Sequence, residues 1–112
     1  MAAAKLIVMY PTPKDVGAFE RAYSDEHLPM AAPIFKAAGA TKVVLTKITG
    51  AASGTSPIHR IAEIHFPSLQ SLNECAASAP GREALAHART ISNGGAPTVL
   101  IAEEEVVTFV SG

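Results

Sequence analysis

The sequence predicts an α+β domain in which one antiparallel four-stranded sheet carries helices on a single face. Three observations support this fold class. Runs of β-branched and aromatic residues alternate with helical patterns in the order β-α-β-β-α-β, turns rich in Pro and Gly separate these segments, and 112 residues suffice for one core. No repeat, charge run or long linker divides the sequence. We therefore expect one domain over residues 1–112.

The first strand and the first helix are predicted in the N-terminal part of the chain. The run Lys5–Tyr10 is rich in β-branched and aromatic residues and ends at Pro11, which predicts a strand. Asp15 follows and has the side chain of a helix N-cap. The apolar stripe of the helix that it begins includes Phe19 and Tyr23.

A proline interrupts the helical pattern after this stripe. Pro29 disfavours the α conformation at Leu28, so we expect the helix to break or kink near His27. A second helical piece is predicted over Met30–Ala38, and Gly39 stands where helices commonly end. His27 would then lie at a junction between two helical pieces.

The rest of the sequence supplies three strands and a second helical region. Two stretches rich in Gly, Ser, Asn and Pro are predicted to be loops, because these residues punctuate regular structure. The expected elements, in order, are a strand over Thr41–Ile48, a loop over Thr49–Pro57, a strand over Ile58–Phe66, a helix over Leu69–Ser78, another over Arg82–Ser92 after an interruption at Pro80 and Gly81, and one long or broken strand over Thr98–Val110.

This order of elements is that of the split βαβ, or ferredoxin-like, motif, in which helices cover one face of the sheet only. The last predicted strand is apolar over Val99–Ala102 and again over Val106–Val110. Side chains alternate along a strand, so only about half of these can point at the helices. An uncovered apolar sheet face is typical of an interface. We therefore expect a homodimer in which the two sheets face each other.

Composition and charge exclude several classes of protein. The chain is 48% apolar with a formal net charge of -1 and no cluster of Lys and Arg interleaved with aromatic residues, so we expect no nucleic-acid partner. No apolar run approaches the ~18 residues of a membrane span and no signal-peptide pattern begins the sequence, so we expect a cytoplasmic protein without a membrane partner. Cys75, the single cysteine, predicts a buried apolar side chain.

Phe19, Tyr23 and His27 form the first candidate site. They recur every four residues, which places them along one helix face if the helix extends that far. The simpler interpretation is that the aromatic side chains belong to the core and that His27 makes a hydrogen bond near the helix break. The functional interpretation is that His27 faces a pocket. Taken alone, the spacing favours packing.

Glu63 and His65 form the second candidate site, on the third predicted strand. If Ile64 and Phe66 face the helices, then His59, Ile61, Glu63 and His65 face the opposite, inter-sheet side. Residues two apart on a strand are separated by about 6.6–6.8 Å, so these two side chains could converge on one small ligand. They are equally compatible with solvent-facing polar positions of a half-exposed strand.

No metal or cofactor site is predicted. His59 and His65 would lie about 20 Å apart along an extended strand, which is too far to share one ion. His27 lacks the second histidine of a His-Glu-x-x-His motif, and His87 lies among charged residues of a helix, which indicates a surface position. The sequence contains no nucleophile-elbow, P-loop or dinucleotide-binding motif.

The pattern of residues over most of the chain resembles the EthD family, which is named for a small protein of ethyl tert-butyl ether degradation. The resemblance is carried by segments around the first strand and helix and at the later helices: Tyr10-Pro11, Asp15, Phe19, Tyr23, His27-Leu28-Pro29, Phe66-Pro67-Ser68 and Ala79-Pro80-Gly81. The chain departs from the family at residues 38–43, where Ala-Gly-Ala-Thr-Lys-Val replaces the usual Pro-Gly-Leu-like helix ending.

This resemblance implies a dimeric α+β barrel, made of two ferredoxin-like subunits joined through their sheets, with a role in oxidative degradation. It also implies that His27 is the characteristic histidine of the family and that Tyr23 is its aromatic neighbour. Site residues are often held at irregular junctions, and a histidine suits acid–base work near neutral pH. With the resemblance added, a pocket role for His27 is favoured over packing.

Two functions are compatible with these residues. In the first, the protein is a small cofactor-independent oxidoreductase, or a cyclase- or isomerase-like enzyme, and His27 is the general acid or base for an apolar or aromatic metabolite. In the second, it is a carrier or accessory dimer of a degradative pathway, and His27 only anchors the polar group of the ligand. In both, the predicted ligand pocket contains Tyr10, Phe19, Tyr23, Glu63 and His65.

Overall fold

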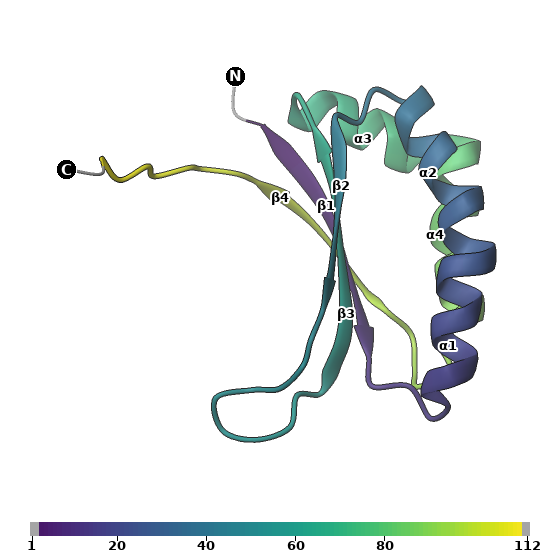
Figure 1. Ribbon diagram of the computed structural model, residues 1–112. Coiled ribbons are helices and arrows are strands. Elements are labelled where there is room, and N and C mark those ends of the chain that lie inside the picture. The colour runs from purple at the N-terminus through teal and green to yellow at the C-terminus, as the bar shows by residue number, and fades with distance from the viewer. Residues whose placement is uncertain (1–2, 111–112) are drawn as a thin grey trace.

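Residues 3–110 are described by a computed structural model, in which four strands form one antiparallel sheet with helices against a single face (Figure 1). The predicted fold class is thereby confirmed. The elements are β1 (Ala4–Pro11), α1 (Val16–Ala22), the π-helical segment η1 (Tyr23–His27), α2 (Leu28–Ala37), β2 (Lys42–Lys47), β3 (Ile58–Phe66), α3 (Leu69–Ala77), α4 (Ala79–Ile91) and β4 (Thr98–Glu103).

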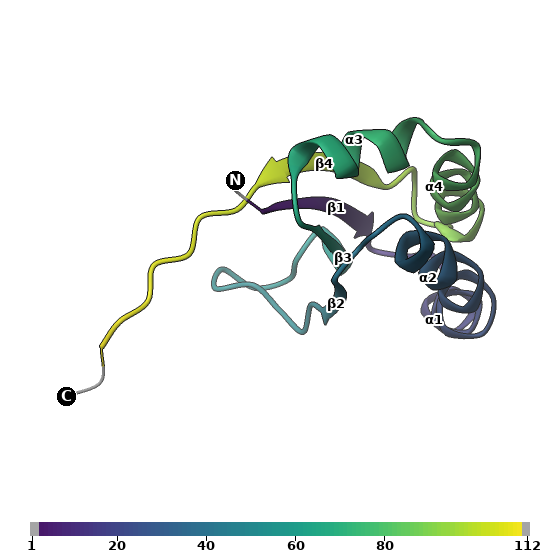
Figure 2. The ribbon, with the colours of Figure 1, turned by 90° about the horizontal axis from the view of Figure 1, so that it is seen from above.

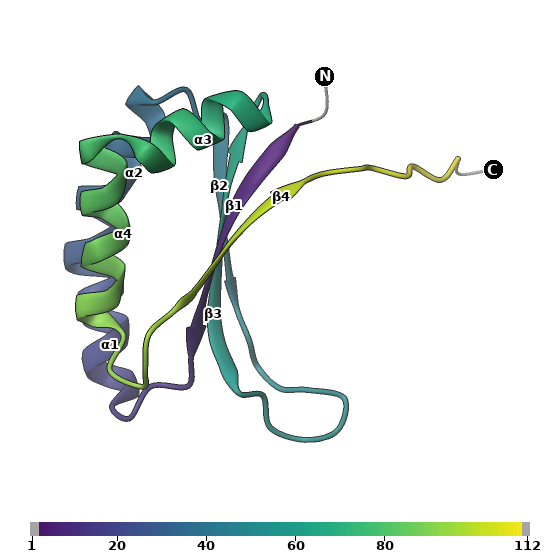
Figure 3. The same ribbon diagram turned by 180° about the vertical axis from the view of Figure 1, so that it is seen from behind.

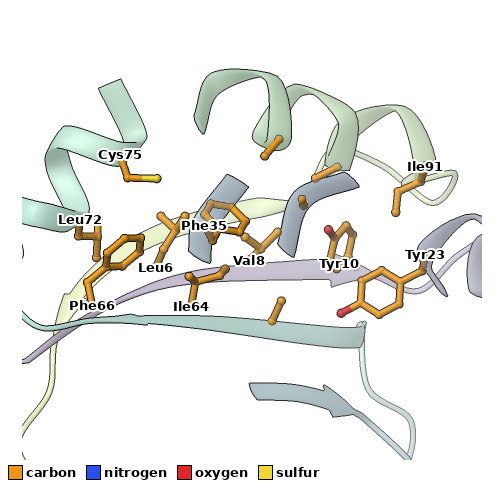
Figure 4. Close-up of a cluster of buried hydrophobic side chains, with 14 of the residues drawn as sticks. Leu6, Val8, Tyr10, Tyr23, Phe35, Ile64, Phe66, Leu72, Cys75 and Ile91 are labelled. Carbon is orange, nitrogen blue, oxygen red and sulfur yellow. The ribbon is translucent and has the colours of Figure 1, made fainter. Parts of the chain in front are cut away.

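The sheet has the strand order β2-β3-β1-β4, which puts β1 and β3 in the centre. Leu6 on β1 is opposite Ile64 on β3 and Ile101 on β4, and residues opposite each other point to the same face. Seen from above, α1, α2 and α4 lie together on one side of the sheet (Figure 2), and the front view shows α3 on that side as well (Figure 1). The core fills the space between them, from Tyr10 and Tyr23 at one end to Phe66 and Leu72 at the other (Figure 4).

The first helical region is continuous, so the helix does not break near His27, although an irregular π-helical turn, η1, ends there and joins α1 to α2. Asp15 caps α1 as expected, since its Oδ1 accepts a hydrogen bond of 3.0 Å from the amide of Ala18. Leu28 keeps helical dihedral angles, φ -62° and ψ -44°, and its amide donates to the carbonyl of Tyr23, five residues back. A proline in a regular α-helix clashes with the carbonyl four residues earlier, and the wider π-turn gives Pro29 room.

The second helical region consists of two helices joined at Ser78. Ser68 caps α3, and Ser78 caps α4 by accepting a 3.1 Å hydrogen bond from the amide of Gly81. Pro80 and Gly81, predicted to interrupt the helical region, instead form the first turn of α4, where a proline needs no amide partner. The two helices pack closely, and a Cβ atom on Gly81 would lie 1.9 Å from the carbonyl oxygen of Cys75.

The last strand is shorter than the predicted span Thr98–Val110. β4 ends at Glu103, which is opposite Ala4, the first residue of its partner β1. The amide of Glu104 still donates to the carbonyl of Ala3 at 2.8 Å. Beyond it the backbone is extended and projects away from the helices (Figure 3). β1 begins at Ala4, so within the described chain it has no further residues with which this stretch could pair.

None of the helices within residues 3–110 is long and apolar enough to span a membrane.

Candidate functional site

A small apolar cavity lies between the sheet and the helices, beneath η1, α2 and α4. Its volume is about 30 Å³, room for about one or two water molecules. Among its lining residues, only Tyr10, Tyr23 and His27 carry polar side-chain groups, and the rest are Ala, Val, Leu, Ile and Phe. Three predicted site residues therefore do line one cavity.

The cavity adjoins a surface groove at the edge of the sheet. The groove has a volume of about 550 Å³ and runs between the end of α2 and the start of β2. Ala32 and Val43 line both the cavity and the groove. The side of the cavity that faces β2 is therefore the route by which a molecule larger than water would enter.

His27 is paired with a second histidine. Its Nδ1 atom lies 2.9 Å from Nδ1 of His87 on α4, and the two rings are parallel to within 3°. One ring must donate and the other accept, so the two histidines hold different tautomers or a shared proton. The predicted surface position of His87 is wrong, because α4 packs beside η1 and brings this half-buried ring against His27.

Burial determines the charge of His27. The His27 side chain is buried, and this desolvation, followed by the nearby charge of His87, lowers the pKa of His27 to about 4. His27 is therefore neutral at pH 7. Among the described residues, no hydrogen-bond partner contacts its Nε2 atom, which leaves that atom to a ligand or to water.

Four rings from α1, η1 and α4 form a column. Phe19 and Tyr23 stack at 17°, Tyr23 and His27 at 20°, and His27 and His87 at 3°, with centroids 5.4, 6.3 and 5.2 Å apart. Tyr10 on β1 packs edge-on against this column, 5.2 Å from Phe19 and 5.5 Å from Tyr23. Phe19 therefore packs against Tyr10 and Tyr23, which line the cavity, but does not line it itself.

The hydroxyl of Tyr23 is the unusual polar group of the site. It is fully buried and has no hydrogen-bond partner among residues 3–110. Burial raises the pKa of Tyr23 to about 12 and also raises that of Tyr10, so both phenols stay protonated. Each phenol can therefore act as a hydrogen-bond donor.

An ion pair, not predicted from the sequence, fixes α1 and Tyr23 against β3. The Arg60 side chain binds Glu20 through two hydrogen bonds of 2.7 and 3.1 Å, and its guanidinium lies 5.2 Å from the Tyr23 ring centroid. The hydrogen bond from Arg60 holds the pKa of the Glu20 carboxyl below its usual range. His59 also contacts Glu20, at 3.3 Å.

The contact of His59 corrects its predicted position on the inter-sheet face. Tyr10 pairs with Arg60 but Pro11 pairs with Ile58, so the register shifts between them and His59 is the extra residue. This β-bulge turns the His59 side chain towards α1, where it contacts the ring of Phe19.

Glu63 and His65 lie on the open face of the sheet, opposite the helices. Ile64 and Phe66 are buried under the helices, as assumed, so their neighbours point away. Glu63 binds Lys5 at 2.6 Å, and His65 lies 3.6 Å from Glu104. These two predicted pocket residues therefore do not line the cavity that holds His27.

No group of three or more His, Cys, Asp and Glu side chains in the described part of the chain is arranged to hold a metal ion.

The residues that sequence reasoning missed, His87, Arg60 and Glu20, are all distant in sequence from their partners. The small residues beside His87 on α4 could have indicated its position. Ala84 and Ala88 are buried and are small enough to let α4 approach the cavity. Glu20 and Arg60 gave no comparable signal.

Comparisons with known proteins agree on the fold. No model of a protein family matches the sequence, and no curated protein matches it significantly. Among solved structures, an ethyl tert-butyl ether degradation (EthD) family protein from Bacillus halodurans C-125 matches with a TM-score of 0.82 at 27% identity, over 92% of this chain and 99% of that one. An EthD-like protein from Ralstonia eutropha JMP134 has a TM-score of 0.69 at 23% identity, over 92% of both chains.

A third similar structure is a dimeric ferredoxin-like protein of unknown function from Jannaschia sp. CCS1. Its TM-score is 0.69 at 17% identity, over 93% of this chain and 99% of that one. At this identity the likeness shows the fold alone, and the homodimer stays a prediction. The resemblance to the EthD family that the sequence motifs predict is therefore confirmed in fold and in chain length.

Proposed function

We propose that this protein binds a small, mostly apolar metabolite with one oxygen function in the cavity that contains Tyr23 and His27. The single observation that carries the proposal is that Tyr23 lines an otherwise apolar cavity and has a buried hydroxyl without a partner among residues 3–110. A buried polar group without a partner costs about 1–3 kcal/mol, which a ligand oxygen would offset. The neutral His27 ring, with Nε2 unbonded to the described chain, supplies a second hydrogen bond beside it.

The size of the cavity restricts how the ligand binds. A volume of about 30 Å³ accepts only the polar end of an organic molecule. The apolar remainder would extend past Ala32 and Val43 into the groove between α2 and β2. An elongated or aromatic molecule with a terminal hydroxyl or carbonyl fits this arrangement.

We also propose that the histidine pair transfers a proton to or from this ligand. A histidine with a pKa of about 4 is a weak base at neutral pH. The contact with His87 removes this limitation if Nε2 of His27 takes the ligand proton while its Nδ1 proton moves to Nδ1 of His87. The positive charge then rests on the half-buried His87 ring instead of on the buried His27. The resemblance to the EthD family favours a place for this step in oxidative degradation.

The alternative function is a carrier that binds the same ligand without transforming it. The low pKa of His27 favours this alternative, because such a ring is a better hydrogen-bond partner than a base. Substitution of His27 separates the two. If His27→Ala abolishes turnover but retains binding, the protein is an enzyme, since a general acid or base contributes about 10²- to 10⁴-fold. If no variant turns over and His27→Ala weakens binding, it is a carrier.

Tyr23→Phe tests the binding site itself, because it removes only the unpartnered hydroxyl and keeps the ring in the column. We expect the free energy of unfolding without ligand to stay the same or rise, since a buried unsatisfied group is lost. We expect affinity for phenols, alcohols and ketones that bind the wild type to fall about tenfold. The measurements are chemical denaturation and ligand-observed NMR titration.

Val16→Ala, at an exposed position of α1 away from the cavity, is the matched control and should leave affinity unchanged. A Tyr23→Phe protein that binds as the wild type does, or whose free energy of unfolding falls by more than about 1 kcal/mol, would contradict the proposal. The Tyr23 hydroxyl would then not be a group that lacks a partner until a ligand binds.

A further inference from the structure

Three residues at helical spacing connect the cavity with the groove along one side of α2. Leu28 lines the cavity, Ala32 lines both spaces, and Lys36 lines the groove. Residues four apart lie on the same side of a helix, one turn above another. A ligand that leaves the cavity past Ala32 therefore follows this side of α2 and reaches Lys36 one turn further on.

The two ends of this path differ in charge. At the cavity end, both phenols are protonated and the ring of His27 is neutral, so no lining side chain is positively charged at neutral pH. At the groove end, Lys36 and Lys42 are the charged lining residues, and no acidic residue stands among them. Within residues 3–110 neither lysine takes part in an ion pair. The groove is therefore a place of uncompensated positive charge.

Lys36 is the lysine that faces the path. Val43 and Leu45 line the cavity, and side chains alternate along a strand, so the side chain of Lys42 begins on the open face of the sheet. Lys36 is exposed and shares the side of α2 with Ala32. Side chains of a helix lean towards its N-terminus, which for Lys36 is the direction of Ala32 and the cavity.

We propose that the ligand is an acid whose hydroxyl or carbonyl oxygen lies in the cavity and whose carboxylate lies in the groove beside Lys36. This ligand class rests on the proposed function, because it takes the cavity as the site of the oxygen end. The reverse orientation is unfavourable, since a carboxylate in the apolar cavity would lose its water without gaining a cation. A ligand with a cationic end would be repelled by both lysines of the groove.

The path also limits the length of the ligand. Leu28 and Lys36 are two helical turns apart, which is about 12 Å along the axis of α2. The Lys36 side chain leans back by up to about one turn, so the oxygen and the carboxylate should be separated by about 6–12 Å. An ω-hydroxy or ω-oxo acid of medium chain length meets this requirement.

Two probes that differ in charge alone test the proposal. They are ω-hydroxyoctanoate, which extends about 10 Å from its hydroxyl oxygen to its carboxyl carbon, and the methyl ester of the same acid. In the full-length protein, Lys36→Met removes the charge and keeps an unbranched apolar side chain. Lys14→Met is the matched control, because Lys14 is exposed and lines neither the cavity nor the groove. The measurement is the dissociation constant from ligand-observed NMR titration at low and at high ionic strength.

We expect Lys36→Met to raise the dissociation constant of the acid about fivefold at low ionic strength and to change that of the ester less than about twofold. Lys36→Glu should raise the dissociation constant of the acid about tenfold or more, because it adds repulsion. High ionic strength should weaken the binding of the acid to the wild type but not the binding of the ester. Lys14→Met should bind both probes as the wild type does.

Equal effects of Lys36→Met on acid and ester, equal effects of the two methionine variants on the acid, or binding of the acid that is independent of salt would each overturn the proposal. The proposed function survives those results as long as Tyr23→Phe weakens the binding of both probes. If the wild type binds neither probe, or if Tyr23→Phe weakens neither, the proposed function itself fails, and the acid class fails with it.

Discussion

At the scale of single residues, the chemistry of His27 depends on a neighbour that is 60 positions away in the sequence. Its ring shares a short Nδ1–Nδ1 contact with His87, and burial keeps it neutral. The titratable groups that face it are His87 on α4 and Tyr23 on η1, and the Tyr23 phenol stays protonated at neutral pH. The histidine pair therefore decides the response of this site to acid.

Lowering the pH should destabilise the protein through His27. The pKa of His27 is about 4 in the folded state and about 6.5 when unfolded, so the unfolded chain binds the proton first as the pH falls. The stability that neutral His27 contributes is present above pH 6.5 and is lost progressively between pH 6.5 and about 4. Urea denaturation of the wild type and of His27→Gln across this range measures the difference.

His27→Gln keeps a neutral polar side chain, so its stability should depend less steeply on pH in this window. Two-dimensional NMR of the imidazole resonances should show one histidine that remains neutral at pH 5. Equal slopes for the two proteins, or a His27 that titrates near 6.5, would contradict a buried neutral ring.

The cavity residues were predictable because a local pattern places them. Tyr23 and His27 follow at helical spacing and Tyr10 ends a strand, and together with Phe19 these positions carry the family resemblance. His87 and Arg60 reach the site through tertiary packing, about which spacing says nothing. Glu63 and His65 were predicted to face away from the helices, and for that reason they could not have shared a cavity with His27. Their assignment to one pocket combined two faces of the sheet.

At the scale of elements, the junction between α3 and α4 depends on one glycine. A glycine within a helix is replaced by alanine with a gain of about 0.5–1 kcal/mol where space allows. At Gly81 the new Cβ would meet the carbonyl oxygen of Cys75 at 1.9 Å, so the two helices would have to move apart. At Gly17 in α1 the nearest atom, Oδ1 of Asp15, is 3.7 Å away.

The two alanine substitutions should therefore have opposite effects. Gly81→Ala should lower the free energy of unfolding by about 1–3 kcal/mol, as overpacking does, and Gly17→Ala should raise it by about 0.5–1 kcal/mol. Thermal and urea unfolding of both variants measures this. Two shifts of the same sign would show that helix propensity, and not the contact with Cys75, governs Gly81.

The positions of the strands and helices followed from the sequence, and two of its local rules failed for physical reasons. The rule that a residue before proline leaves the α conformation holds for regular helices, but η1 widens the turn and keeps Leu28 helical. The apolar run to Val110 has the composition of a strand, but a strand also needs a partner, and β1 begins opposite Glu103. The amino-acid composition of a segment does not show how long its partner strand is.

At the scale of the whole molecule, the open face of the sheet is the surface that the fold leaves to a partner. Ile7 and Leu100 are opposite each other on this face, and Val44 lies on it two strands away from Ile7. Glu63, in its ion pair with Lys5, lies within this apolar centre, between Val44 and Ile7. The predicted homodimer would bury this ion pair together with the apolar side chains around it.

A charge introduced at this centre should dissociate the dimer. Leu100 is 44% exposed, so Leu100→Glu should leave the subunit folded but raise the dissociation constant about tenfold or more, because dimerisation would bury the carboxylate. Val16, at 46% exposure on α1, provides the control Val16→Glu, which should not affect association. Sedimentation velocity at micromolar concentration distinguishes the species. A wild type that is a stable monomer there, or equal behaviour of both variants, would contradict a sheet-to-sheet dimer.

The π-turn also affects the winding of the whole helical region. Four residues of an α-helix advance a side chain about 40° beyond a full turn, whereas four residues of a π-helix fall short of one. The step from Phe19 to Tyr23 is α-helical and therefore exceeds a full turn. The step from Tyr23 to His27 is π-helical and falls short of one, so the two deviations from a full turn largely cancel. Had the helix stayed regular, His27 would stand about 80° around the axis from Phe19 and could not continue the line of rings. Pro29, a helix breaker by composition, thereby favours the turn that keeps the aromatic column in register.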